Sequence, residues 1–232
     1  MILKRLINFS IISCISVTSF AQTGAVWLKG GVNFANVSHN KNGEVDVANM
    51  LTSFHVGLMG NINIAKVLAV QPGILLTGKG SKIQSGSPND NFYYKATANP
   101  LYIEMPINLA IKLPLASPGS NFFFGVGPYI AIGVGGKRKI EGRDFAISYN
   151  NKEKIEFSND DLTTFNNEEG TGLGVMRRFD YGLNGIAGFE LENVLIGINY
   201  GYGLAKLQSG SNNSKDNNNK HRVLGISVGF KL

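Results

Sequence analysis

The chain has 232 residues, of which 29 are glycine, 43% are hydrophobic and only 16% are charged. Glycine is above, and charge well below, the usual composition of a globular protein. The length fits one domain or two small ones, and the composition excludes a highly charged disordered protein. The formal net charge is +6, and +4 remains without Lys4 and Arg5, so the charge does not call for nucleic acid as a partner.

The N-terminus has the features of a secretory signal peptide. Lys4 and Arg5 precede an apolar run at 6–20, and Ser19-Phe20-Ala21 places small residues at the two positions that signal peptidase reads. We therefore predict a signal peptide at 1–21 and an outer-membrane β-barrel domain, argued from the strands below, at 22–232. Beyond residue 21 no run of about 18 apolar residues occurs, which excludes a helical protein with several membrane spans.

Two other interpretations of the N-terminus stay open. It could be a membrane anchor, although its apolar run is short for a span. It could also be a lipoprotein signal, because Ile11-Ile12-Ser13-Cys14 resembles a lipobox. Cys14 is the single cysteine, so residues 22–232 contain no thiol for a disulfide, a zinc site or a nucleophile.

Strict alternation of apolar and polar residues marks the clearest strand. From Leu101 to Leu113 all seven odd positions are apolar, whereas the even positions carry Tyr, Glu, Pro, Asn, Ala and Lys. A period of two predicts a strand with one apolar face. Seven further segments alternate in the same way, and the eight predicted strands cover residues 26–34, 54–64, 68–76, 101–113, 122–134, 179–189, 194–204 and 224–232.

The connections between these strands alternate in length. Short connections lie at 65–67, 114–121 and 190–193, and longer loops are expected at 38–53, 79–100, 136–177 and 208–221. An even number of strands with every long loop at one end is typical of barrels in the bacterial outer membrane. We therefore predict an all-β fold, an eight-stranded antiparallel up-and-down transmembrane β-barrel. A water-soluble, lipocalin-like barrel is the alternative, and it would keep its apolar residues inside.

Aromatic residues and glycines fit the membrane barrel. On the apolar face, Phe54, Tyr181 and Tyr200 lie near the long-loop end, and Phe124 and Phe230 lie near the short-loop end, as two aromatic girdles would. The other face is rich in glycine. Small residues there suit an eight-stranded barrel, whose interior is only just wide enough to hold side chains.

Four segments of the chain carry a family resemblance. They are Gly30-Gly31-Val32-Asn33, Tyr102-Ile103-Glu104-Met105-Pro106-Ile107, Phe124-Gly125-Val126-Gly127-Pro128-Tyr129 and the terminal Val228-Gly229-Phe230-Lys231-Leu232. With them the chain resembles the PorT-like outer-membrane β-barrel family of Bacteroidetes. The resemblance implies insertion by the outer-membrane assembly machinery. One departure is the last residue, Leu232, where such barrels usually end on an aromatic residue.

Strand parity assigns the polar residues to the lumen. Five of them are charged, and we predict that Lys29, Glu104, Lys112, Asp180 and Glu190 form one network, because a buried carboxylate needs a cation. The favoured interpretation is a structural polar plug organised by Glu104, and a proton or ion path is the alternative. The neutral members of this predicted lumen set are Asn33, His55, Asn61, Asn63, Gln71, Asn108, Asn184 and Asn199.

The longest expected loop begins with a basic cluster. Lys137, Arg138 and Lys139 are predicted to lie at the outer rim, and one hypothesis is that they contact lipopolysaccharide phosphates. The favoured interpretation is a solvated loop. Ser158-Asn159-Asp160 could start a short helical turn later in the same loop, and residues 209–220 form a loop rich in Asn and Ser.

The sequence predicts no catalytic residue, cofactor or metal site. The three histidines, His39, His55 and His221, have no close metal-ligand spacing, and no Gly-x-Ser-x-Gly motif occurs. The predicted role is that of a small barrel with a filled lumen, acting structurally or by surface binding through its long loops. Narrow porin-like transport and a secretion-accessory role are alternatives, and an outer-membrane lipid-modifying enzyme is less favoured. Outer-membrane lipid, lipopolysaccharide and the assembly machinery are the expected partners, nucleic acid is not, and a protein partner outside the cell or in the periplasm stays open.

Overall fold

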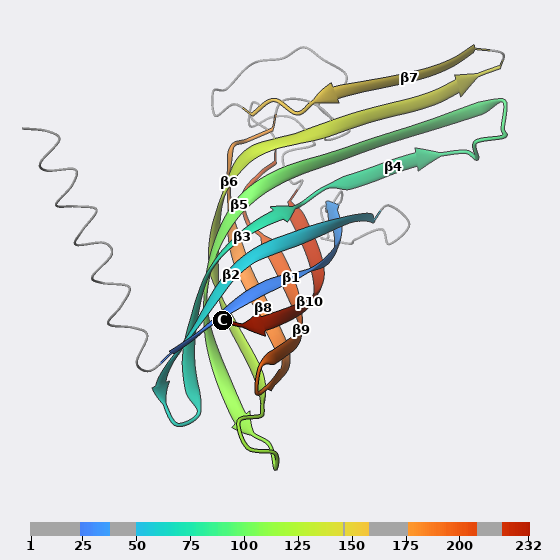
Figure 1. Ribbon diagram of the computed structural model, residues 1–232. Coiled ribbons are helices and arrows are strands. Elements are labelled where there is room, and N and C mark those ends of the chain that lie inside the picture. The colour runs from blue at the N-terminus through green and yellow to red at the C-terminus, as the bar shows by residue number, and fades with distance from the viewer. Residues whose placement is uncertain (1–23, 38–49, 146, 158–175, 208–219) are drawn as a thin grey trace, which may run out of the picture.

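One continuous antiparallel sheet forms the molecule (Figure 1). The computed structural model describes residues 24–37, 50–145, 147–157, 176–207 and 220–232. No helix among these residues is long and apolar enough to cross a membrane. The sheet contains ten strands: β1 (Gly24–Val37), β2 (Leu51–Ala65), β3 (Leu68–Gly78), β4 (Ser81–Ser85), β5 (Phe92–Pro114), β6 (Asn121–Asp144), β7 (Ile147–Lys154), β8 (Phe179–Leu191), β9 (Val194–Gly203) and β10 (His221–Lys231).

Three sequence predictions lie outside the described residues. They are the signal peptide at 1–21 with Cys14, the helical turn at 158–160, and almost all of the Asn-rich loop at 209–220. These features stay predictions.

Eight of the strands close into a ring. The order around it is β5, β3, β2, β1, β10, β9, β8 and β6, and β6 pairs again with β5. The first and last strands meet along their length, from Trp27 opposite Lys231 to Val37 opposite His221. The predicted eight-stranded antiparallel barrel is thereby confirmed. Both ends of the described barrel lie on the side of the short turns, as an even strand number requires.

The apolar row of every barrel strand points outward. Ile107, Val126 and Ile198 are 56%, 68% and 55% exposed, whereas their polar neighbours Asn108 and Asn184 are buried. A continuous belt of exposed Leu, Ile, Val and Phe around a protein marks contact with lipid. The water-soluble alternative requires the opposite orientation, so the structure excludes it.

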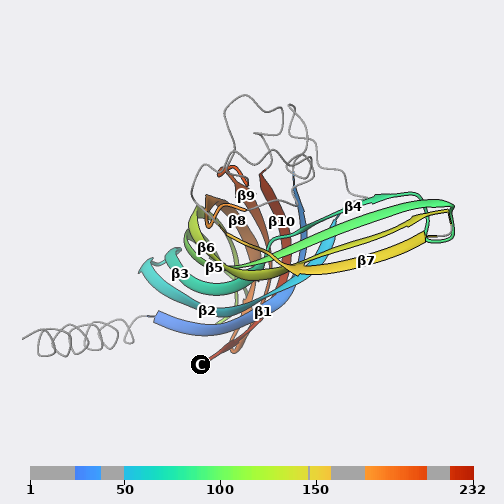
Figure 2. The ribbon, with the colours of Figure 1, turned by 90° about the horizontal axis from the view of Figure 1, so that it is seen from above.

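The prediction of long loops is wrong for two segments of the chain. Residues 79–100 and 136–177 contain strands: β5 begins at Phe92, β6 continues to Asp144, and β4 and β7 flank them. Beyond the barrel rim these segments form a four-stranded sheet in the order β4, β5, β6, β7. We call this sheet the extension. It bends at the rim and runs out past the ring (Figures 1 and 2).

The extension escaped prediction because its strands carry no complete apolar row. Residues 92–99 read Phe-Tyr-Tyr-Lys-Ala-Thr-Ala-Asn, and 137–144 read Lys-Arg-Lys-Ile-Glu-Gly-Arg-Asp. Much of this sheet is surrounded by solvent, so neither face needs the uninterrupted apolar row that lipid imposes. The backbone pairing, with Phe92 opposite Asp144 and Asn99 opposite Lys137, holds it together.

Substituting glycines in the barrel wall by alanine tests how closely neighbouring strands pack. A Cβ at Gly127 would lie 2.0 Å from the carbonyl oxygen of Ile107 on the neighbouring strand, whereas a Cβ at Gly185 would meet nothing within 4 Å. We expect Gly127→Ala to lower the free energy of unfolding in detergent by about 1–3 kcal/mol through overpacking. Gly185→Ala is the matched control and should be neutral or slightly stabilising. Equal stability of the two variants in a urea titration would contradict this packing.

Candidate functional site

The lumen is filled in layers, and an apolar layer lies near the short-turn end. Trp27, Phe123 and Leu195 stand close to the starts of β1, β6 and β9, and all three are at most 4% exposed. They pack with Met59 and Leu75 into one cluster. Five large apolar side chains inside so narrow a barrel leave no water-filled path at this level.

A neutral hydrogen-bond network lies further up the lumen. His55 Nδ1 is 2.8 Å from Asn33 Oδ1, and His55 Nε2 is 2.9 Å from Ser227 Oγ. The Asn33 amide in turn donates to Thr77 Oγ1 at 2.8 Å and to the Gly78 carbonyl at 3.1 Å. These bonds join β1, β2, β3 and β10 across the interior, and they satisfy polar groups that have little access to solvent.

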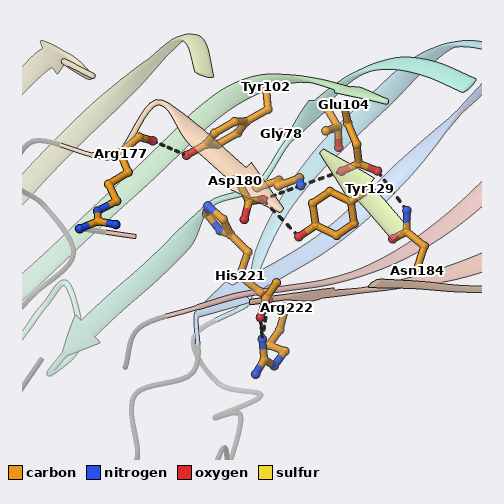
Figure 3. A network of polar contacts seen from close by, with 12 residues as sticks. Gly78, Tyr102, Glu104, Tyr129, Arg177, Asp180, Asn184, His221 and Arg222 are labelled. Carbon is orange, nitrogen blue, oxygen red and sulfur yellow. Dashed lines mark hydrogen bonds and ion pairs between the residues drawn. The ribbon is translucent and has the colours of Figure 1, made fainter. Parts of the chain in front are cut away.

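A cluster of charges, shown in Figure 3, shares one small cavity with this network. Lys79 lies between two carboxylates, with Nζ 2.6 Å from Glu104 Oε2 and 2.7 Å from Asp180 Oδ2. Tyr129 donates to Asp180 at 3.2 Å, and Asn184 donates to Glu104 at 3.3 Å. The Lys79 ammonium also stands 3.9 Å from the centroid of the Tyr129 ring, a cation–π distance. One buried cation thus pairs with two carboxylates, and hydroxyl and amide groups donate further hydrogen bonds to them.

Some buried polar atoms in this region have no hydrogen-bond partner among the described residues. They are Asp180 Oδ1 and both ring nitrogens of His221, whose ring packs edge-on against Tyr102 at 5.5 Å. Beside the charge cluster lies a cavity of about 20 Å³, lined by polar groups that include His55, Lys79 and Glu104. That volume holds about one water molecule, which suits a structural site rather than a passage.

The outer end of the lumen is closed by aromatic and apolar side chains. Phe157 packs edge-on against Tyr102, with 5.6 Å between ring centroids, and its ring occupies the space beside Gly133. Above it, Ala96 and Ala98 of the extension are buried in a cluster with Val37, Met176 and Leu207. Since Val37 ends β1, which lies across the ring from β6, the base of the extension spans the mouth of the barrel.

The structure divides the predicted charge network into two parts. Lys112 and Glu190 form a separate ion pair of 2.5 Å near the short turns. Glu104 and Asp180 share Lys79, which the sequence analysis did not include. Lys29 is buried, but among the described residues no ion pair within 4.0 Å joins it to a carboxylate. Lys79, not Glu104, therefore stands at the centre of the larger cluster.

Strand parity could have identified Lys79. Its side chain follows the inward row of Gln71, Gly73, Leu75 and Thr77, but the predicted strand ended at residue 76 and left Lys79 in a loop. Most of the neutral lumen set is buried as predicted. Asn63, close to the short turn, is exposed, and Asn199 is half-buried.

The basic cluster at 137–139 lies on strand β6 of the extension, and strand alternation separates its members. Arg138 pairs with Glu153 of β7 on one face. Lys139 contacts Glu141 on the other face, which it shares with Lys137. The expected single cluster is therefore corrected to two lysines on one face and an arginine, engaged by a carboxylate, on the opposite face.

The described residues offer little for catalysis. No group of three His, Cys, Asp or Glu side chains among them is placed to hold a metal ion. His55 is engaged on both ring nitrogens by Asn33 and Ser227. What the geometry provides is a barrel with a filled lumen and a paired sheet whose base lies over its mouth.

A closed barrel with an apolar outer belt and a polar, filled lumen defines the class of outer-membrane β-barrel proteins. The model of the family described as "outer membrane protein beta-barrel domain" matches residues 20–209. The chain belongs to this family, and its place is the bacterial outer membrane. A search of curated protein sequences finds no significant match.

Solved structures of outer-membrane proteins are similar in fold to the chain at low sequence identity. Ail, the attachment invasion locus protein of Yersinia pestis, is 12% identical, with 90% of this chain and 99% of that chain covered and a TM-score of 0.39. Neisserial surface protein A is 11% identical, with 89% and 96% covered and a TM-score of 0.42. Because these scores are low, the assignment rests on the family model and on the closed sheet.

We expect removal of the cation from the charge cluster to lower the stability of the barrel strongly. Lys79→Met leaves two buried carboxylates without a counter-charge, so we expect a loss of about 3–5 kcal/mol in the free energy of unfolding. Adding Glu104→Gln and Asp180→Asn to Lys79→Met should restore much of the loss, because the two side chains that faced Lys79 are then neutral. Lys66→Met, in an exposed turn, is the control. Urea titration in micelles measures all three, and a Lys79→Met variant as stable as the control would refute the assignment.

Proposed function

We propose that this protein is a non-conducting, non-enzymatic barrel that anchors a binding surface, the extension, outside the cell. The observation that carries the proposal is the contrast between a blocked interior and an ordered exterior. The lumen is filled by the cluster around Trp27, by the Lys79 ion cluster and by Phe157, whereas the extension continues β5 and β6 as a paired sheet beyond the rim.

The way in which the extension is held supports a binding role. A flexible loop needs no packing, but the base of the extension buries Ala96 and Ala98 against residues from the opposite wall. Toward the tip, Phe92 and Phe145 stack edge-on at 4.7 Å, and the Tyr149 ring covers Gly142. A sheet held at its base and along its length presents its outer face in a fixed geometry, which lowers the entropy cost of binding a ligand.

We also propose a finer family placement, which the residues of the lumen support. We place the chain in the PorT-like branch, because Tyr102, Glu104 and Pro106 of its Tyr-x-Glu-x-Pro segment are all buried in the lumen. Tyr102 closes the outer end against Phe157, and Glu104 binds Lys79. This segment thus builds the plug, which gives a physical reason for its residue types.

The position of the barrel in the outer membrane supports proposals about its partners. The outward belt contacts membrane lipid, and the assembly machinery inserts the barrel. Lys137 and Lys139 lie at the base of the extension, next to the rim, where lipopolysaccharide phosphates are within reach of an ammonium group. Residues 1–21 act as the signal peptide that exports the chain.

Surface display is tested by single-cysteine labelling, because residues 22–232 contain no cysteine. Asn150→Cys, exposed on β7, should react on intact cells with a polymer-linked maleimide too large for porins. Lys66→Cys, in the short turn between β2 and β3, should react only after the outer membrane is opened. Labelling of Lys66→Cys alone on intact cells would reverse the proposed orientation.

A plugged lumen predicts no stable conductance. Purified protein in planar lipid bilayers should show no discrete openings at moderate voltage, because apolar layers block both ends of the interior. Reproducible unitary currents from folded protein, verified by its heat-modifiable gel mobility, would instead favour the passive-transport alternative.

A further inference from the structure

Strand alternation gives the extension two chemically different faces. Residues opposite one another in an antiparallel pair point to the same side. One side carries Ala96, Ala98, Tyr94 and Ile140, and its base is buried over the barrel mouth. The other side carries seven cations and one carboxylate, and we call it the basic face. Its charged residues are Lys82, Lys95, Lys137, Lys139, Glu141, Arg143, Lys152 and Lys154.

The basic face looks away from the barrel. Since the opposite face packs at its base on Val37, Met176 and Leu207 across the mouth, the basic face is turned toward the external medium. Lys137, Arg143, Lys152 and Lys154 are exposed there. Lipid headgroups around the rim are within reach only of the base of this face, at Lys137 and Lys139, whereas Lys95 and Arg143 lie further out along the extension.

The arrangement of these charges is unfavourable for the sheet itself. Lys137 is directly opposite Lys154, and Lys139 is directly opposite Lys152. Like charges at opposed positions destabilise a strand pair. The one carboxylate, Glu141, contacts Lys139 and lies 3.6 Å from Lys95, so it does not separate either opposed pair. The hydrogen bond from Lys139 holds the pKa of Glu141 below its usual value, so Glu141 is ionised at neutral pH.

The residue types indicate the kind of anion. Six of the seven cations are lysines, which act as separate point charges, whereas a single phosphate or carboxylate group is best held by arginine forks. The charges are spread over four strands, at about 4.8 Å between strands and about 6.8 Å between alternate residues of a strand. A spaced array of this kind matches a chain with repeated negative groups.

We propose that the basic face binds an extended anionic polysaccharide in the external medium, a role that rests on the surface-binding function proposed above. A polysaccharide fits better than single-stranded nucleic acid, because nucleic-acid platforms stack bases on several aromatic rings. The basic face offers Tyr93 alone among its described residues, beside Arg143.

The closing experiment measures binding of full-length protein in micelles to dextran sulfate, with neutral dextran as the ligand control. The informative variant is Lys152→Glu/Lys154→Glu. It turns both opposed lysine pairs into attractive ones, so folding should be unimpaired or improved, while two cations of the basic face are lost. We expect its dissociation constant for dextran sulfate to rise about tenfold or more. Lys66→Glu/Lys231→Glu changes the net charge equally at the short-turn end and should leave binding unchanged.

The outcomes separate the two proposals. Salt-sensitive binding of dextran sulfate that is lost in Lys152→Glu/Lys154→Glu and kept in the control supports the basic face as the site. Equal loss in both variants, no binding by the wild type, or tighter binding of lipid A vesicles or single-stranded DNA would overturn it. Asn150→Cys labelling on intact cells is measured in parallel. If labelling persists without binding, the ligand proposal fails alone, whereas loss of labelling removes the surface-binding function itself.

Discussion

Closure of the sheet is the constraint on which everything else depends. Inside a bilayer no water is present to satisfy backbone groups, so each strand must be paired on both sides. The pairing of β1 with β10 meets this demand and fixes the number of strands at eight. Eight strands enclose a narrow interior, which must be packed like a protein core. Along each strand, the side chains that fill this interior alternate with side chains that face lipid.

Both apolar and polar side chains fill the interior. Near the short turns, Trp27, Met59 and Phe123 fill space as they would in a soluble core. Further up, Lys79 with Glu104 and Asp180 fills space with charge, which is tolerable only because each group has a partner. An interior filled in this way supports the proposal of a non-conducting barrel. The proposed binding role therefore falls to residues beyond the rim.

The sequence predicted the barrel well because lipid imposes a simple pattern. Alternation from Leu101 to Leu113 fixes both the strand and its orientation, and the inward row follows from it. Lys79 was missed because β3 continues beyond the end of its apolar row. Lys112 and Glu190 form a separate pair because of the stagger between β5 and β8, and strand parity carries no information on stagger. The extension was missed because water, unlike lipid, allows Lys, Thr and Glu at any position of a strand.

A closed barrel has no free strand edges, but among the described residues the extension has two. Its outer strands β4 and β7 each have one side without a neighbouring strand in the described sheet, and such edges invite a second molecule to add to them. β4 is only five residues long, and β7 ends in Lys-Glu-Lys. A short edge and a charged edge both discourage intermolecular strand pairing. The lysines of the proposed polyanion-binding face thus also discourage edge-to-edge pairing between neighbouring copies of the chain.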